Sequence, residues 1–339
     1  MRRIALLLAL LPILVPCLVS AQLAMNAKPI VEIGAADGSV DEAFSMIGDV
    51  AVTGRGDILV LDRFATDIAW FAASGRFIRR IGRSGSGPGE FRQRYAMAVD
   101  GQNRLHVYDP GGRRISVYAL SDTLAVHLAD QRIESVVNDI CIIGDRRFVL
   151  TPEQPAIIHE LDRDGQAVRS FGAPEQPHRD VARRIPNNPP RLLTFYNQAL
   201  LACDAASGTI AVVHENVPVV RLFGIDGTLR WRAVLADFHQ REVNPSTRFP
   251  MGFEIRTDPD IGSAHAGSAV AFTPDRRLVV TLWEGGPSNI EGRIETRILD
   301  VGDGRELERQ DAPPARLTKV VGGRSYAYTQ YPYPRVLVY

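Results

Sequence analysis

The sequence predicts an all-β chain folded as a six-bladed β-propeller, a closed ring of four-stranded sheets. One observation is a strand pattern that recurs every 47 residues, as aligning Asp57–Asp62 with Arg104–Asp109 shows. A second is that the chain begins with a segment that matches the last strand of a repeat and ends on a segment that matches an earlier strand of that repeat. A period in the forties with short strands and polar turns is typical of propellers. Closing the ring also removes the open sheet edges that a linear array would expose.

The repeat extends on both sides of the aligned strands. Ala51-Val52 aligns with Ala98-Val99 upstream, and Ile68–Phe71 aligns with Ile115–Tyr118 downstream. The apolar runs are short, rich in Val, Ile and aromatic residues, and bounded by Gly, Asp, Asn and Pro, so no long amphipathic helix competes with strands. Four further second strands bring the expected number of blades to six: Phe148–Thr151, Ile210–Val213, Leu278–Thr281 and Tyr326–Thr329.

Closure of the ring is predicted from the two chain ends. Ile30–Ile33 and Gly34 repeat the pattern seen at Ile78–Gly82 and Val168–Gly172, where it follows a strand and a Gly-containing turn. No such strand precedes Ile30, whereas Val336–Tyr339 is a strand with nothing after it. We therefore expect the N-terminal segment to form the outer strand that completes the C-terminal blade.

One blade carries a family resemblance. Gly85–Phe91, Ala98–Asp100, Leu105–Asp109 and Arg114–Tyr118 resemble one unit of the NHL-repeat type of six-bladed propeller. The usual Pro-x-Gly ahead of the first strand is replaced here by Arg94–Ala96. The resemblance implies the fold across residues 28–339 and carries little information about activity.

The N-terminus has the parts of a bacterial secretory signal. Met1–Arg3 is basic, Ile4–Val19 is apolar, and small residues follow up to Ala21. Residues 1–21 are therefore predicted to be a signal peptide, and residues 22–339 a single propeller domain in the periplasm or outside the cell.

The N-terminal sequence also bears on membrane attachment. The apolar stretch is short for a membrane span and is interrupted by Pro12 and Pro16, so no transmembrane segment is predicted. Cys17 raises the alternative of a lipid anchor. Pro16 argues against that anchor, because the residue before a lipoprotein cysteine is normally small.

The charge balance excludes one class of partner. The chain has 39 basic and 39 acidic residues, and loss of Arg2 and Arg3 with the leader would leave a small negative balance. Such a surface has no global attraction to nucleic acid or anionic lipid, so no nucleic-acid partner is predicted. The oligomeric state stays open.

Two cysteines remain after the leader. Cys141 and Cys203 fall on one repeat position, which Ala51, Ala98 and Ala271 share on other innermost strands. A small side chain is expected there because inner strands pack closely near the ring axis. Equivalent points on neighbouring strands are expected to lie too far apart for a disulfide, so two buried free thiols are predicted.

Loop lengths identify the face expected to function. The long links join the outer strand of one blade to the inner strand of the next, at Arg83–Arg94, Ala173–Arg191 and Asp237–Ser263. Links on the opposite face, such as Asp226-Gly227, are tight turns. Long irregular loops in a compact domain are typically functional or disordered. The asymmetry favours a binding face, although the Pro-rich link at 173–191 also fits a simple insertion.

Inner strands start on this long-loop face, so their first residues are expected to line the mouth of the central channel. A mixture of cations, amides and phenols there would suit an anionic or sugar-like ligand. The alternative is that the channel is simply wet and polar, as in any propeller. The candidate ligand-binding residues are Arg94, Tyr95, Asn138, Asp139, Tyr196, Asn197, His265 and Arg316.

Catalysis is the less favoured hypothesis. Lactonase-like six-bladed propellers hold a divalent ion in the channel, and Asp49, Asn138, Asp139 and Asn197 could supply oxygen ligands for Ca²⁺. A zinc lyase would need several channel histidines, and His265 alone is expected there. No nucleophile or phosphate-binding motif is visible.

The sequence therefore favours an exported binding or scaffold protein without a cofactor, which recognises a protein, peptide or glycan through its long-loop face. The alternatives are a lactonase- or lyase-like enzyme with Ca or Zn in the channel, and a purely structural ring.

Overall fold

The computed structural model describes residues 28–37, 41–93, 95–152, 155–185, 190–248, 252–258, 263–286, 289–311 and 315–339. The predicted signal peptide and Cys17 lie outside these residues. Within them, no helix is both long and apolar enough to cross a membrane.

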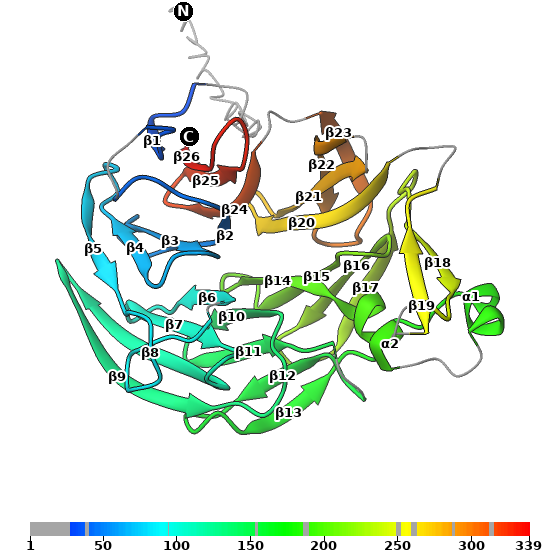
Figure 1. The fold of residues 1–339 in the computed structure, drawn as a ribbon, viewed down its shortest axis with the longest axis horizontal. Coiled ribbons are helices and arrows are strands. Elements are labelled where there is room, and N and C mark those ends of the chain that lie inside the picture. Colours follow the sequence, from blue (N-terminus) through cyan, green and yellow to red (C-terminus); the bar gives the residue numbers. More distant parts are fainter. Residues whose placement is uncertain are drawn as a thin grey trace, which may run out of the picture.

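The described chain forms a ring of six four-stranded antiparallel sheets, which confirms the predicted fold (Figure 1). Blade 1 contains β2 (Ile47–Val52), β3 (Ile58–Asp62), β4 (Ile68–Phe71) and β5 (Phe77–Ile81). Blade 2 contains β6 (Ala96–Val99), β7 (Arg104–Asp109), β8 (Arg114–Ser121) and β9 (Leu124–Arg132). Blade 3 contains β10 (Asp139–Ile143), β11 (Arg146–Leu150), β12 (Ile158–Leu161) and β13 (Ala167–Phe171).

The second half of the ring follows the same order. Blade 4 contains β14 (Ala199–Asp204), β15 (Thr209–His214), β16 (Val219–Gly224) and β17 (Leu229–Val234). Blade 5 contains β20 (Ala264–Phe272), β21 (Arg277–Gly286), β22 (Asn289–Asp300) and β23 (Glu306–Asp311). Blade 6 contains β24 (Arg316–Val321), β25 (Arg324–Thr329), β26 (Arg335–Val338) and, as its outer strand, β1 (Val31–Ile33).

The two chain ends share blade 6. β1 pairs antiparallel with β26, and Val31 lies opposite Val338. Gly34 follows β1 with φ of 124°, and a Cβ there would lie 2.6 Å from the carbonyl oxygen of Pro334. A side chain at this position would therefore both strain the backbone and push the end of β1 away from the chain before β26.

The core lies between neighbouring blades. Strands with β-branched and aromatic residues bury both faces, as in β3 and β4, where every residue is buried. Ile58 and Phe71 of blade 1 pack in one cluster with Tyr326 and Val336 of blade 6. The inner strands also contact one another in cyclic order, including β24 with β2. Blade 6 therefore packs against blade 1, and the ring is closed.

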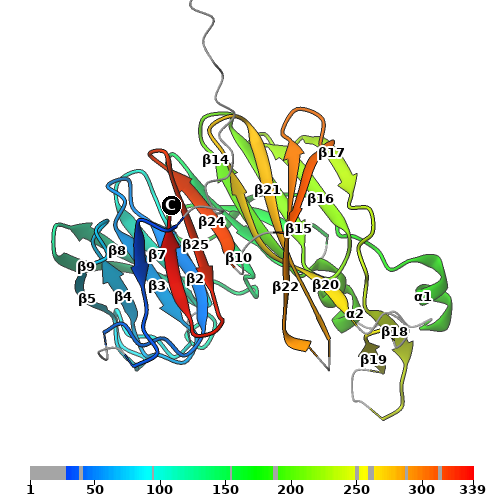
Figure 2. The ribbon, with the colours of Figure 1, turned by 90° about the horizontal axis from the view of Figure 1, so that it is seen from above.

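Two insertions project from the long-loop face beside blade 4. The link after β13 contains α1 (Arg179–Arg184) and α2 (Pro190–Asn197), and the link after β17 contains the hairpin of β18 (Glu242–Pro245) and β19 (Phe253–Arg256). Figure 2 shows these elements together on one side of the ring. They are held by one apolar cluster, in which Val181 and Phe195 pack with Val243 and Phe253.

The structure corrects the expectation of two free thiols. Cys141 on β10 and Cys203 on β14 form a disulfide, and their Cα atoms lie 5.6 Å apart. That separation falls in the range a disulfide requires. Face-to-face sheets usually pack about 10 Å apart, but inner strands converge toward the ring axis, which brings equivalent positions closer together.

Candidate functional site

The central channel contains a cavity of about 390 Å³. Its lining at the end where inner strands begin includes Tyr95, Asn138 and Asp139, which the sequence places at the mouth, and Asp49. Two residues that the sequence analysis did not single out, Arg63 and Glu215, also line it. The mouth thus combines three carboxyl groups with a guanidinium, a phenol and an amide.

Asp49 and Asp139 each join two adjacent blades. Asp49 Oδ2 accepts a hydrogen bond from the backbone N–H of Met97 at 2.8 Å, and Asp139 Oδ2 accepts one from Leu201 at 2.7 Å. The other oxygen of each carboxyl accepts the N–H of the following residue. The bonds from Met97 and Leu201 satisfy backbone donors on the inner strand of the next blade, and the bonds from Val50 and Ile140 satisfy donors on the aspartate's own strand. A structural role for both aspartates is therefore established, and each oxygen retains a further lone pair toward the channel.

The three carboxyl groups at the mouth have pKa values above those of ordinary carboxyl groups. Burial raises the pKa of Asp49 and of Asp139, and the neighbouring charge of Asp49 raises that of Asp139 further. Burial raises the pKa of Glu215 to about 7, although Arg63 and Arg241 lower it. Desolvation penalises the charged form of each group, and the two arginines do not offset that penalty. Around neutral pH this cluster therefore binds protons that isolated carboxylates would release.

The arginine and phenol at the mouth are paired. The guanidinium of Arg63 lies over the ring of Tyr95, with Cζ 5.3 Å from the centroid. Burial raises the pKa of the Tyr95 phenol, so the hydroxyl stays protonated at neutral pH. The next residue, Phe64, leaves 73% of its surface exposed on the same link between β3 and β4. The cavity lining thus includes the aromatic ring of Tyr95, and the exposed Phe64 follows Arg63 in the chain.

Arg63 and Glu215 share a position in the repeat that the sequence analysis overlooked. Arg63 directly follows β3 and Glu215 directly follows β15, the second strands of their blades. Because a second strand runs back toward the face where the inner strand began, the residue after it returns to the mouth. The first polar residue after each second strand is the signal that would have found both.

Two predicted mouth residues lie elsewhere. Tyr196 and Asn197 form the last turn of α2 and are buried, so their placement at the start of an inner strand is wrong. The Asn197 side chain accepts the N–H of Glu175 at 2.8 Å and donates to the carbonyls of Glu175 and Leu193. It ties the link after β13 to α2, which accounts for its burial and removes it from the channel metal set.

His265 and Arg316 are also outside the channel lining. His265 is the second residue of β20 but is buried among Phe238, His239 and Glu284. Arg316 begins β24 with its guanidinium 5.5 Å from the ring centroid of Tyr328. Arg94 lies outside the described residues. Among the described residues, Arg63 supplies a cation to the mouth.

Comparisons with known proteins agree with the fold. A family model described as a 6-bladed beta-propeller matches residues 41–145. No curated protein matches the sequence. One similar structure is a Bacteroides fragilis protein that is predicted to be exported, with 13% identity, a TM-score of 0.57, and coverage of 91% of this chain and 93% of the other.

Two further structures have similar shapes. A member of the duf4221 family from Bacteroides vulgatus has 7% identity and a TM-score of 0.57, with 91% and 94% of the two chains covered. A streptogramin B lyase has 11% identity and a TM-score of 0.50, with 88% and 79% covered. At these identities the likeness concerns the fold alone. The chain is a six-bladed β-propeller, and its function must be argued from its own site.

Proposed function

We propose that this propeller is an exported recognition module that binds a protein, peptide or glycan through its long-loop face. The observation that carries the proposal is the cavity at the channel mouth. The carboxyl groups of Asp49, Asp139 and Glu215 line this one cavity, which opens on the face that bears both insertions. Concave sites with a few convergent polar groups are where propeller and other scaffolds bind ligands.

Among these ligands, a peptide or protein segment with a basic side chain fits best. The raised pKa of Glu215 means that burial destabilises its carboxylate, and a bound ammonium or guanidinium would restore the lost stabilisation. Exposed Phe64 beside Arg63 offers an apolar contact for the neighbouring part of such a segment. Binding of a cation would also release the proton that the cluster holds near neutral pH.

Export is supported by the N-terminal pattern of a basic start, an apolar stretch and small residues up to Ala21. The similar Bacteroides fragilis protein that is predicted to be exported is compatible with this location. Mass spectrometry of the mature N-terminus after expression in a bacterial host tests it, and a chain that retains Met1–Ala21 would contradict it.

The ligand class is tested by applying the mature protein to arrays of peptides and of glycans at neutral pH. We expect bound peptides to contain Lys or Arg, and we expect exchange of that residue for norleucine or citrulline to abolish the signal. Selective binding to neutral glycans, or to peptides without a basic residue, would contradict the cationic ligand.

Binding of a metal ion in the channel is a second candidate function. Asp49, Asn138 and Asp139, three of the four residues that the sequence analysis offered as ligands, line the same cavity. Their oxygen atoms suit Ca²⁺, which the lone pairs left by the backbone bonds could bind. Elemental analysis of dialysed protein, with thermal unfolding at several Ca²⁺ and Zn²⁺ concentrations, tests this function. A stoichiometric ion whose stabilising effect is lost in Asp139→Asn would favour it over peptide recognition.

A further inference from the structure

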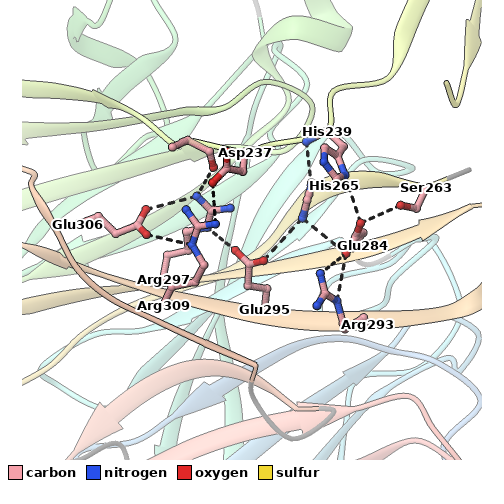
Figure 3. A network of polar contacts seen from close by, with 11 residues as sticks. Asp237, His239, Ser263, His265, Glu284, Arg293, Glu295, Arg297, Glu306 and Arg309 are labelled. Carbon is pink, nitrogen blue, oxygen red and sulfur yellow. Dashed lines mark hydrogen bonds and ion pairs between the residues drawn. The ribbon is translucent and has the colours of Figure 1, made fainter. Parts of the chain in front are cut away.

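A polar cluster formed by blade 5 and the loop before it is distinct from the channel mouth (Figure 3). Its centre is His265 on β20, and Figure 3 shows it between the loop residue His239 and the carboxylates of Glu284 and Glu295. Glu284 lies on β21 and Glu295 on β22, so three strands and one loop meet here. The loop is the segment at 237–241, which joins β17 to the β18–β19 hairpin.

His265 and His239 form a reciprocal pair. The backbone N–H of His239 donates to His265 Nδ1 at 2.9 Å, and the backbone N–H of His265 donates to the carbonyl of His239 at 2.8 Å. The ring of Phe238 lies 5.3 Å from that of His265. Because Nδ1 accepts a hydrogen bond, it carries the lone pair, and the ring proton of neutral His265 must be on Nε2.

The proton on Nε2 has no hydrogen-bond partner among the described residues. The atom is buried, and it lies 3.8 Å from Glu284 Oε2 and 3.9 Å from Glu295 Oε2. The side chain of His265 is only 2% exposed. The imidazole is therefore aimed into a closed space between two carboxylates without bonding to either one.

This cluster contains residue types that bind metals, but the proton positions on His265 do not suit a metal ligand. Ligand atoms of His239, His265 and Glu284 lie within 4.8 Å of one another. A metal at Nε2 would need its lone pair, and Nδ1 would then carry the proton and would point at the His239 N–H. Metal-binding histidines normally donate from their second nitrogen to an acceptor, which is the opposite arrangement. The geometry favours a proton-linked contact.

The charged groups that face His265 within the described parts of the chain already have partners. Arg293 forms an ion pair with Glu284 at 2.6 Å, and Ser263 donates to the same carboxylate at 2.8 Å. The fully buried Arg297 pairs with Glu295. The His239 ring also contacts Glu284, at 3.3 Å. The carboxylates would attract an imidazolium, whereas Arg297, His239 and burial oppose it.

We propose that His265 is a proton-operated clasp: neutral His265 holds the 237–241 segment on β20, and a second proton, taken from solvent at Nδ1, releases that segment. Protonation replaces the lone pair at Nδ1 with an N–H, so two donors face each other and the His239 amide loses its acceptor. Burial keeps the pKa of His265 below its ordinary value of 6.5, with the nearby Glu284 and Glu295 opposing that shift. The clasp is therefore closed at neutral pH and opens on acidification.

The 237–241 segment connects the clasp to the channel mouth. Two residues after His239 is Arg241, whose charge lowers the pKa of Glu215. The intervening Gln240 hydrogen-bonds the Tyr196 phenol on α2. Release of the segment would take Arg241 away from the mouth and strengthen proton binding at Glu215. This consequence for ligand binding rests on the proposed function, whereas the clasp itself does not.

The test is amide hydrogen exchange of peptides covering 237–241, measured by mass spectrometry without any ligand. The wild-type protein is compared between about pH 8 and about pH 5, with intrinsic exchange corrected on the unfolded chain. We expect at least about tenfold loss of protection at the lower pH, as for a buried N–H that loses its hydrogen-bond acceptor. Equal protection at both values would overturn the proposal.

Variants separate the clasp from other titrating groups. His265→Asn keeps an acceptor oxygen near the position of Nδ1 but does not titrate, so its protection should be high at both pH values. His265→Phe removes the acceptor and should give low protection at both, with circular dichroism used to confirm the fold. His239→Ala retains the backbone N–H and should still lose protection on acidification, at a somewhat higher pH than wild type because the His239 ring no longer opposes protonation of His265. A pH-dependent loss in His265→Asn equal to that of wild type would refute the mechanism, because the carboxyls at the mouth remain in that variant.

Discussion

Glu215→Gln should stabilise the protein at alkaline pH and weaken ligand binding. The Glu215 side chain lines the channel cavity, and no hydrogen bond to its carboxylate is found among the described residues. Burial therefore acts on it without direct compensation, apart from the charges of Arg63 and Arg241. Glutamine has nearly the same shape and carries no charge, so the substitution removes the desolvation cost and leaves the packing intact.

The magnitude follows from the pKa. A rise from 4.5 in the unfolded chain to about 7 in the folded protein corresponds to an upper bound of about 3 kcal/mol. Since Glu215 is partly accessible from the channel, water reduces this cost, and we expect about 1 to 3 kcal/mol. The sign is that of a raised carboxyl pKa. The folded state binds more protons than the unfolded state between pH 4.5 and about 7, so stability decreases as pH rises through this window.

The assay is urea unfolding of oxidised protein at several pH values from about 5 to about 8.5. Wild type should lose stability toward the upper end, and Glu215→Gln should lose less. Glu134→Gln is the matched control, because its side chain is 64% exposed in a surface ion pair and should change stability by less than about 0.5 kcal/mol. A Glu215→Gln protein that is no more stable than wild type at pH about 8.5 would refute a buried, uncompensated carboxylate.

Three further predictions concern the scaffold. Replacing Cys141 and Cys203 together by Ala should lower the free energy of unfolding by about 4 kcal/mol in denaturant titrations, as expected for a cross-link spanning 62 residues; two free thiols in denatured, unreduced protein would contradict the bridge. Arg297→Met should cost about 3 to 5 kcal/mol, because it leaves the buried Glu295 carboxylate unpaired, and an unchanged urea midpoint would show that the pair is dispensable. Gly34→Ala should cost about 1 to 3 kcal/mol by straining the closure of blade 6, and a wild-type melting temperature would show that the strand end tolerates a side chain.

The architecture could be predicted because propeller strands repeat their chemistry. The residues from Asp57 to Asp62 and from Arg104 to Asp109 align in the sequence, and both segments contain the second strands of their blades, β3 and β7. Short apolar strands and the turn residues that bound them recur from blade to blade, so local pattern and global fold agree. The N-terminal pattern before Gly34 likewise indicated the strand that pairs with β26.

The site was less predictable, for reasons that concern geometry between blades. The Cys141–Cys203 bridge depends on how closely inner strands converge, which a single repeat does not encode. Glu215 reaches the channel from the end of a second strand, and its environment arises from blades that are distant in sequence. Asn197 was placed on a strand because α2 is only eight residues long and starts within a Pro-rich link, where helical periodicity is hard to recognise.

The central claim, recognition of a basic segment at the channel mouth, is tested most directly by isothermal titration of an array-selected basic peptide into three proteins. These are wild type, Glu215→Gln at the mouth, and Asp204→Asn at the far end of β14, which lines the same cavity. Our account predicts at least about tenfold weaker binding for Glu215→Gln, unchanged binding for Asp204→Asn, and proton release on binding to wild type near neutral pH. Equal affinity for Glu215→Gln and wild type would contradict it.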